Sequence, residues 1–367
     1  MNEILQKSSR DLDRTRADLT AWLARKLPTG SAPEVAELTA PPTGQSSETL
    51  LFTATWQEEG ARRTRRLVAR VAPRQVDMPI FPSYQMKREF QVIRSVGELT
   101  GAPVPEAVWV EPDPTAFGTP FYIMNRVDGL VPDDITYNSA GWLFEASRDE
   151  QRLVQESTVS ALAALHAAPD PEQNFAFLQF PEAGDTALRR HVAHAQAWYD
   201  YAVALAGRCL LIERGFAWLD ERWPADPGDT VLSWGDARVN NVIYRDFRPA
   251  ALLDWEMAGL GPREIDLAWL VGGHHVFEGI AGLLGSPGLP QFLRLEDVAT
   301  QYEAETGHAL RHMDFFLTYT AIQWAIVFVL AGLRRVHFAE QPMPGDVHDL
   351  IINRGPLEQM LTAGHSI

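Results

Sequence analysis

Apolar residues near the start of the chain recur at helical spacing. Five of them share one face over residues 9–27 and predict an amphipathic helix. They are Leu12, Leu19, Trp22, Leu23 and Leu27. Ser8 or Ser9 stands where a residue can cap the N-terminus of this helix, and the sequence LPTGSAP ends it.

Short β-like runs replace this pattern between about residues 34 and 125. Thr49–Trp56 and Arg65–Pro73 are two such runs, and Gly60 in the charged segment between them predicts a hairpin turn. A helical pattern follows over Tyr84–Leu99, and the sequences EAVWVE and PFYIMNR predict two further strands. Two strands, a helix and two more strands are typical of a small sheet that carries one helix.

Helical patterns dominate the second part of the chain. Apolar residues recur at helical spacing in residues 151–168, 187–207 and 210–223. One β-like interlude follows, in which NVIY and AALLD flank the turn-forming sequence RDFRP. This interlude predicts a single hairpin within a helical region.

Residues 315–335 are long and apolar enough to resemble a membrane-spanning helix. Thr318, Thr320 and Gln323 interrupt the segment, and the sequence contains no second span of this kind. We therefore expect a helix buried at the centre of a helical lobe, where helices are apolar all round, and no membrane partner.

Composition limits the function further. A length of 367 residues exceeds what one compact core usually takes, so we expect two lobes. The net charge of −16 argues against a nucleic-acid partner, because phosphate binding needs a basic face. An acidic surface favours cations and polycationic substrates, although the same charge also serves solubility.

The single cysteine, Cys209, excludes an internal disulfide and a cysteine-based metal cluster. The first residues lack the apolar core of a signal peptide. A reducing, cytoplasmic location fits both observations. The sequence leaves the oligomeric state open.

Three polar residues stand at one end of the predicted hairpin. Asp236 and Asn241 precede its first strand, and Asp254 follows its second strand. Adjacent strands lie about 5 Å apart, so local structure brings these side chains together. Two carboxylates and an amide oxygen form a hard-oxygen set suited to Mg²⁺. The alternative is a polar hairpin with ordinary turn residues.

This set meets the needs of phosphoryl transfer. One Asp accepts the proton of the attacking hydroxyl, while an Asn and a second Asp hold Mg²⁺ at the β- and γ-phosphates. In protein kinases the Asn likewise stands five residues after the base. We therefore predict Asp236 as the base, with Asn241 and Asp254 as metal ligands. Arg238 is predicted to stabilise phosphoryl charge, its alternative role being an ion pair with nearby acids.

The sequence WGDARVNN, followed by LLDWEMAGLGPREIDLA, resembles the signature of the aminoglycoside phosphotransferase and choline kinase-like family. The usual form in this family is H-G-D-x-x-x-x-N, then I-D-W/F-E, then G-x-x-x-x-D-L-A. The resemblance covers most of the chain from about residue 30. It implies an α+β, bilobal, protein-kinase-like fold with a small β-rich N-lobe and a larger, mostly helical C-lobe. It also implies ATP, Mg²⁺ and a small-molecule hydroxyl acceptor.

The resemblance implies roles for residues of the N-lobe as well. The sequence TGQSSETLLF looks like the loop that covers the phosphates, so Gly44, Ser46 and Ser47 are expected at the triphosphate. Arg70 stands where the family usually has a phosphate-binding Lys, and Glu89 matches the ion-pair partner of that residue.

The remaining expectations concern the junction between the lobes and the C-lobe. The backbone from Met124 to Arg126 matches the linker that meets adenine, and His166 resembles the helix end that precedes a substrate lid. Asp266 is expected to cap a helix or to brace the catalytic loop. The predicted divisions are an N-terminal helical arm over 1–29, a nucleotide-binding N-lobe over 30–126, and a catalytic and substrate-binding C-lobe over 127–367.

Three residues depart from the family pattern. Trp234 replaces the usual His before Gly-Asp, Arg70 replaces Lys, and Asn240 stands where Gly is common. None of them removes the base or a metal ligand, and Arg can clamp phosphate with its planar fork. Trp234 and Arg70 nevertheless leave open a nucleotide-binding, pseudokinase-like protein that transfers nothing.

The acceptor stays open at this stage. The family phosphorylates aminoglycosides, macrolides, choline, sugars and hydroxyacyl-CoA thioesters. The acidic balance favours a cationic acceptor such as an aminoglycoside, which would imply antibiotic resistance. A CoA thioester would instead require a basic patch, and only Arg62–Arg66 is densely basic.

Overall fold

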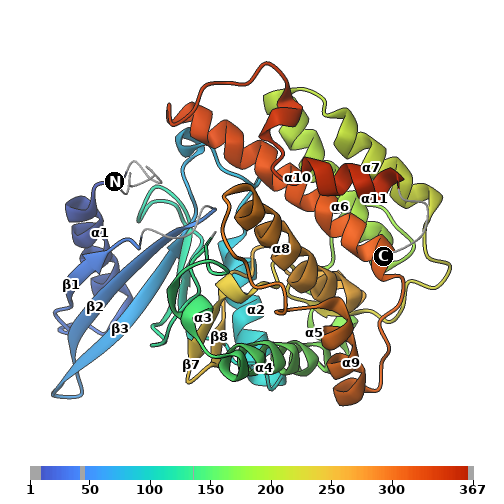
Figure 1. Ribbon diagram of the computed structural model, residues 1–367. Helices are drawn as coiled ribbons and strands as arrows, with labels where there is room; N and C mark the ends of the chain where they lie inside the picture. Colours follow the sequence, from blue (N-terminus) through green and yellow to red (C-terminus); the bar gives the residue numbers. More distant parts are fainter. Residues whose placement is uncertain (1–9, 42–45, 135, 363–367) are drawn as a thin grey trace.

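The strands expected before residue 126 form one antiparallel sheet in the computed structural model, which describes residues 10–41, 46–134 and 136–362. Its five strands lie in the order β1-β2-β3-β5-β4 (Figure 1). They are β1 Glu34–Thr39, β2 Glu48–Glu58, β3 Ala61–Val71, β4 Ala107–Glu111 and β5 Phe121–Asn125. The hairpin of β2 and β3 turns at Gly60 as expected, with a φ of +78° that glycine adopts freely.

A helix covers each face of this sheet. These helices are α1 (Leu12–Lys26) and α2 (Met86–Leu99). Phe121 and Ile123 of β5 belong to the cluster that contains the apolar face of α1. Tyr122 and Met124 belong to the cluster that contains α2 and the helical lobe. The alternation follows from the two-residue period of a strand and couples the sheet to both helices.

The cap of α1 differs from the expectation. The side chain of Asp11 accepts hydrogen bonds from the N–H groups of Asp13 at 2.9 Å and Arg14 at 3.2 Å. Asp11 is thus the N-cap, because an aspartate carboxylate can satisfy the free N–H groups of the first turn. Ser8 and Ser9 lie outside the described residues.

The rest of the chain is mostly helical. Its longer helices are α4 Arg148–His166, α6 Ala187–Ala206, α7 Leu210–Glu221, α8 Glu264–Leu283, α9 Leu295–Thr306 and α10 Met313–His337. The shorter ones are α3 Gly141–Glu145, α5 Pro171–Asn174 and α11 Arg354–Thr362. Figure 1 shows this helical lobe beside the sheet, with α6, α7 and α11 gathered around α10.

Helix α10 is the buried helix that the sequence predicts. Among the described residues it is the one helix long and apolar enough to cross a membrane, and 83% of its most apolar stretch is buried inside the protein. Its contacts with α6, α7, α8 and α11 place it at the centre of the helical lobe. Such burial is typical of the core helix of a helical lobe.

The residues predicted for catalysis lie in the loops beside two pairs of short strands. β7 (Val242–Arg245) and β8 (Arg248–Leu252) form the expected hairpin, which turns at Asp246 and Phe247 with φ values of 51° and 58°. β6 (Val231–Ser233) pairs with β9 (Gly259–Gly261). The division at residue 126 between two functional lobes stays a prediction.

Candidate active site

The carboxylate of Asp266 on α8 holds the turn after β6 through hydrogen bonds. This carboxylate accepts hydrogen bonds from the Ser233 hydroxyl at 2.7 Å, from Trp234 N–H at 2.8 Å and from Gly235 N–H at 2.9 Å. His166 Nε2 lies 2.9 Å from Asp266 Oδ2, the oxygen that also accepts the bond from Trp234 N–H. Burial favours protonation of Asp266, but the bonds from His166 and the two N–H groups lower its pKa overall. Asp266 therefore braces the loop as an ionised group.

Trp234 links this loop to the segment after β8. The ring is fully buried, and its Nε1–H donates a hydrogen bond to the Leu253 carbonyl oxygen at 2.8 Å. Gly235 has a φ of +89°, and a Cβ atom there would lie 2.3 Å from the Met257 carbonyl oxygen. The position therefore requires glycine. The indole of Trp234 thus serves as a scaffold, holding the loop against the residue before Asp254.

Asp236 is surrounded by three donors. Trp269 Nε1–H donates to its Oδ1 at 2.7 Å, and Asn241 Nδ2–H donates to its Oδ2 at 2.7 Å. The Arg238 Nε atom lies 3.2 Å from the carboxylate. Burial and the nearby charge of Asp254 raise the pKa of Asp236, while these donors counteract the shift. A carboxylate with a raised pKa is a stronger base than one in water.

A backbone bond brings the two halves of the hairpin end together. Leu253 N–H donates to the Asn241 carbonyl oxygen at 2.8 Å, which places Asp254 beside the loop that carries Asp236. The amide nitrogen of Asn241 is engaged by Asp236, so its amide oxygen is the atom left to bind a cation. Asp254 has a φ of 62°, an uncommon backbone conformation for a residue other than glycine. The structure thus brings Asp236, Asn241 and Asp254 together.

Arg238 is held by two carboxylates. Its Nη1 atom lies 2.8 Å from Asp134 Oδ1, on the segment that joins the sheet to the helical lobe, and its Nε faces Asp236. Burial disfavours the charged guanidinium, but the two carboxylates leave the pKa of Arg238 raised. Asn240 Nδ2–H donates to the Asp133 carbonyl oxygen at 2.6 Å, which gives the asparagine a role on the same segment. Sequence reasoning missed Asp134.

Arg70 points toward the same centre from β3. Its guanidinium forms an ion pair with Asp254 and donates a hydrogen bond to the Thr49 hydroxyl at 2.7 Å. Within the described part of the chain, Arg70 forms no ion pair with Glu89, contrary to the expected pairing. Glu89 instead accepts a 3.4 Å hydrogen bond from the Tyr122 hydroxyl. A buried carboxyl group, that of Glu89, and a half-buried one, that of Asp254, lie near Arg70, and Asp254 is the one that pairs with it.

The start of β2 approaches this centre through two serines. Ser46 donates a hydrogen bond to Glu256 Oε2 at 2.6 Å. The Ser47 hydroxyl is buried and has no hydrogen-bond partner among the described residues. Gly44 lies outside the described residues.

Three carboxyl groups surround Arg70 at this centre, those of Asp254, Glu256 and Glu89. Burial, together with the charge of Asp254, raises the pKa of Glu89 to about 7 and the pKa of Glu256 well above its usual range. Both shifts favour the neutral forms of Glu89 and Glu256, and Asp254 is the carboxylate paired with Arg70. Among the described residues no three His, Cys, Asp or Glu side chains are arranged to hold a metal by themselves. A Mg²⁺ ion fits such a site, because it commonly takes one or two carboxylates and completes its shell with phosphate and water.

Part of the backbone of the predicted adenine linker is already hydrogen-bonded within the sheet lobe. Arg126 N–H donates to the Arg66 carbonyl oxygen and Asn125 N–H to the Glu106 carbonyl oxygen, both at 2.9 Å. The Met124 side chain is buried. Adenine contact at Met124 and Arg126 therefore stays a prediction.

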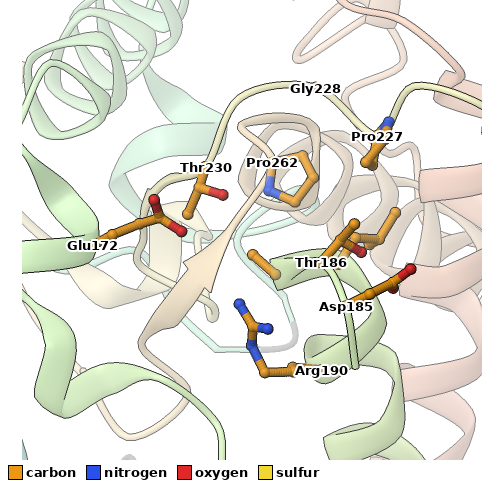
Figure 2. A pocket seen from close by; sticks show the side chains of 10 residues that line it. Glu172, Asp185, Thr186, Arg190, Pro227, Gly228, Thr230 and Pro262 are labelled. Atoms are coloured by element: carbon orange, nitrogen blue, oxygen red, sulfur yellow. The ribbon is translucent and has the colours of Figure 1, made fainter. Parts of the chain in front are cut away.

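Two cavities lie outside this centre. Figure 2 shows the smaller one, of about 220 Å³, into which Arg190 reaches from α6 between Glu172 and Asp185. The larger, of about 860 Å³, lies along α4 and α9 and includes Arg148 and Arg248. None of the residues predicted for catalysis or nucleotide binding lines either cavity.

Comparison with known proteins places this arrangement in context. A family model described as the phosphotransferase enzyme family matches residues 37–286. Acyl-CoA dehydrogenase family member 11 of Homo sapiens is 29% identical over 191 residues, which cover 51% of this chain and 23% of that protein. Acyl-CoA dehydrogenase family member 10 of Mus musculus is 27% identical over 208 residues, covering 56% of this chain and 18% of that protein. The match thus spans less than a quarter of these relatives.

Solved structures share the fold over nearly the whole chain. A Ralstonia eutropha JMP134 protein, assigned by name to the aminoglycoside phosphotransferases, superposes with a TM-score of 0.64 at 22% identity, covering 94% of this chain and 96% of that one. A thermostable mutant of aminoglycoside phosphotransferase APH(4)-Ia in complex with AMP-PNP and hygromycin B gives a TM-score of 0.54 at 16% identity, covering 95% and 99% of the two chains. These likenesses confirm the bilobal, kinase-like fold.

Proposed function

Because this chain belongs to the phosphotransferase enzyme family, we propose that it transfers the γ-phosphoryl group of ATP, bound with Mg²⁺, to a hydroxyl group of a small molecule. The observation that carries the proposal is the meeting of Asp236, Asn241 and Asp254 at one end of the hairpin. This set unites a base with two oxygen ligands, as phosphoryl transfer requires.

Asp236 is the proposed base. It takes the proton of the acceptor hydroxyl while the hydroxyl oxygen forms a bond to the γ-phosphorus and the bond from that phosphorus to the oxygen of ADP breaks. The hydrogen bonds from Trp269 and Asn241 fix the orientation of the carboxylate. The raised pKa of Asp236 makes it a better proton acceptor.

Arg238 is proposed to stabilise the charge on the phosphoryl group during transfer. Its ion pair with Asp134 supports this role, since it orients the guanidinium beside Asp236. Arg70, Glu89, Ser46 and Ser47 are proposed at the triphosphate. Met124 and Arg126 are proposed at adenine.

Asn241 and Asp254 are the residues that would hold Mg²⁺. When bound, the ion neutralises the charge of the phosphate oxygens and orients them. The three carboxyl groups around Arg70 support a divalent cation there, because its charge would favour their ionised forms.

Two acceptor classes follow from the comparisons. The names of the curated relatives favour a hydroxyacyl-CoA thioester, and their identity of 29% exceeds the 22% of the Ralstonia structure. The APH(4)-Ia complex with hygromycin B favours an aminoglycoside, in line with the net charge of −16. We rank the thioester first because the curated relatives are more similar to this chain in sequence than the solved structure is.

An ATP-consumption screen tests the proposal. Hydroxyacyl-CoAs, aminoglycosides, macrolides, sugars and choline are each offered with Mg·ATP, and the phosphorylated product is identified by mass. Transfer to any hydroxyl that disappears in Asp236→Ala supports the proposal. Tight Mg·ATP binding with no transfer to any acceptor would instead favour the pseudokinase-like alternative. A cytoplasmic location remains part of the proposal.

A further inference from the structure

Arg10, just before α1, inserts its side chain into the sheet lobe. Only 4% of that side chain is exposed. Its Nε atom forms a 2.7 Å ion pair with Glu48 Oε2, and the partner carboxylate is itself buried, with 8% exposed. A charged pair this deeply buried needs close hydrogen-bonding geometry to be tolerated.

The other guanidinium nitrogens reach two more parts of the sheet. Nη1–H donates to the Phe117 carbonyl oxygen at 2.7 Å, and Nη2–H to the Thr119 hydroxyl at 2.5 Å. Nη2 also lies 3.3 Å from the Ala72 carbonyl oxygen. One side chain therefore joins the start of β2, the end of β3 and the approach to β5.

These attachment points flank the residues proposed at the triphosphate. Glu48 is the first residue of β2 and stands two residues after Ser46. Ala72 directly follows β3 and stands two residues after Arg70. Both strands therefore have their phosphate-facing ends fixed by Arg10. The family match begins at residue 37, so this arm lies outside it.

We propose that Arg10 is a positioning residue for ATP, which sets the distance between the Ser46–Ser47 segment and Arg70 and so shapes the triphosphate site. The inference rests on the proposed function, because it takes these residues to contact phosphate. Arginine suits the task because the donors of its planar fork can hold these four acceptors at once, whereas lysine offers a single point charge.

The test compares variants at the two ends of the arm. Arg10→Ala and Arg10→Lys remove or simplify the fork. Lys26→Ala is the matched control, because Lys26 at the other end of α1 pairs with Glu111 at 3.0 Å, away from the serines and Arg70. Dissociation constants of ATP with Mg²⁺ and of adenosine are measured by calorimetry, with thermal unfolding of each variant alongside.

Arg10→Ala is expected to weaken Mg·ATP binding about tenfold, as loss of a buried charged hydrogen-bond partner commonly does. Arg10→Lys should give an intermediate loss. Adenosine binding should stay unchanged in both, because the arm acts on the phosphate side alone. Lys26→Ala should bind both ligands as the native protein does. If Arg10→Ala fails to fold, Glu48→Gln serves in its place, because it removes the charge of the Arg10–Glu48 ion pair. This variant is expected to weaken Mg·ATP binding and to leave adenosine binding unchanged.

The outcomes separate the two proposals. Equal Mg·ATP affinity in the native protein and the Arg10 variants would overturn this inference alone. Parallel losses of ATP and adenosine binding would also overturn it, because they indicate a general loss of structure. Absence of Mg·ATP binding by the native protein would overturn the proposed function and this inference with it.

Discussion

The Nε1–H of Trp234 donates a hydrogen bond to the Leu253 carbonyl oxygen at 2.8 Å. The bond connects the loop that carries Asp236 to the residue before Asp254. The tryptophan that departs from the family pattern is therefore a structural tie between the proposed base and a proposed metal ligand.

Trp234→Phe should lower the free energy of unfolding by about 2 kcal/mol, because it leaves the Leu253 carbonyl oxygen without its donor and removes ring atoms that are fully buried. Chemical denaturation measures this loss. Trp142→Phe is the matched control, since its Nε1–H donates to the Val131 carbonyl oxygen at an exposed site, where water can replace it. Equal losses in the two variants would contradict the role given to Trp234.

Asp236→Ala should reduce kcat by a factor of about 10² or more, since it removes the proton acceptor. The affinity for Mg·ATP should change little, because the proposed metal ligands remain. Single-turnover transfer and nucleotide titration measure the two effects. Asp200→Ala on the exposed face of α6 controls for loss of an aspartate. Turnover close to native in Asp236→Ala would remove this residue from the mechanism.

Asp134→Asn should release one of the two carboxylates that hold Arg238. The guanidinium then pairs more closely with Asp236 and lowers the pKa of that carboxylate. We expect kcat to fall about tenfold and the acidic limb of the pH–rate profile to move to lower pH. Asp133→Asn, one residue away, should leave the profile in place. A fall in kcat with no movement of the limb would show that Asp134 serves stability alone.

The local part of the site could be predicted from the sequence. Asp236, Asn241 and Asp254 lie at the end of a single hairpin, so strand geometry alone brings them together. Asp134 is different: it stands 104 residues before Arg238 and meets it only when the segment after β5 folds against the loop that carries Asp236. Nothing in the residues around Asp134 distinguishes it from an exposed loop acid.

The partner of Arg70 shows a second limit. The sequence predicts Glu89 as the ion-pair partner of Arg70, whereas the structure pairs Arg70 with Asp254, which stands 184 residues later in the chain. The same holds for β6 and β9, which have three residues each and are too short for a two-residue period to be recognised. The longer helices and the five-stranded sheet, by contrast, follow from periodicity.

Raising the pH from about 5 to 7 should lower the free energy of unfolding when nucleotide and metal are absent. The pKa of Glu89 is about 7 in the folded state, raised by burial and by Asp254 against the attraction of Arg70, Tyr122 and Arg88. The unfolded carboxyl loses its proton at a lower pH, so between about pH 5 and pH 7 the folded state binds more protons. The free energy of unfolding should therefore fall across this window. Glu89→Gln should flatten the dependence, and an unchanged slope would reject this cause.

Asp254→Asn should remove the effect of Mg²⁺ on nucleotide binding. Asp254, which pairs with Arg70 in this structure, would supply the ion with a carboxylate ligand in the native protein. We expect ATP to bind the native protein roughly tenfold more tightly with Mg²⁺ than with EDTA. In Asp254→Asn the two affinities should converge, because an amide oxygen is a poor substitute for a carboxylate. Titration of ATP under both conditions measures this ratio, with Asp200→Asn as the control. A variant that keeps the native ratio would show that the metal is held elsewhere, and it would leave the ion pair with Arg70 as the sole role of Asp254.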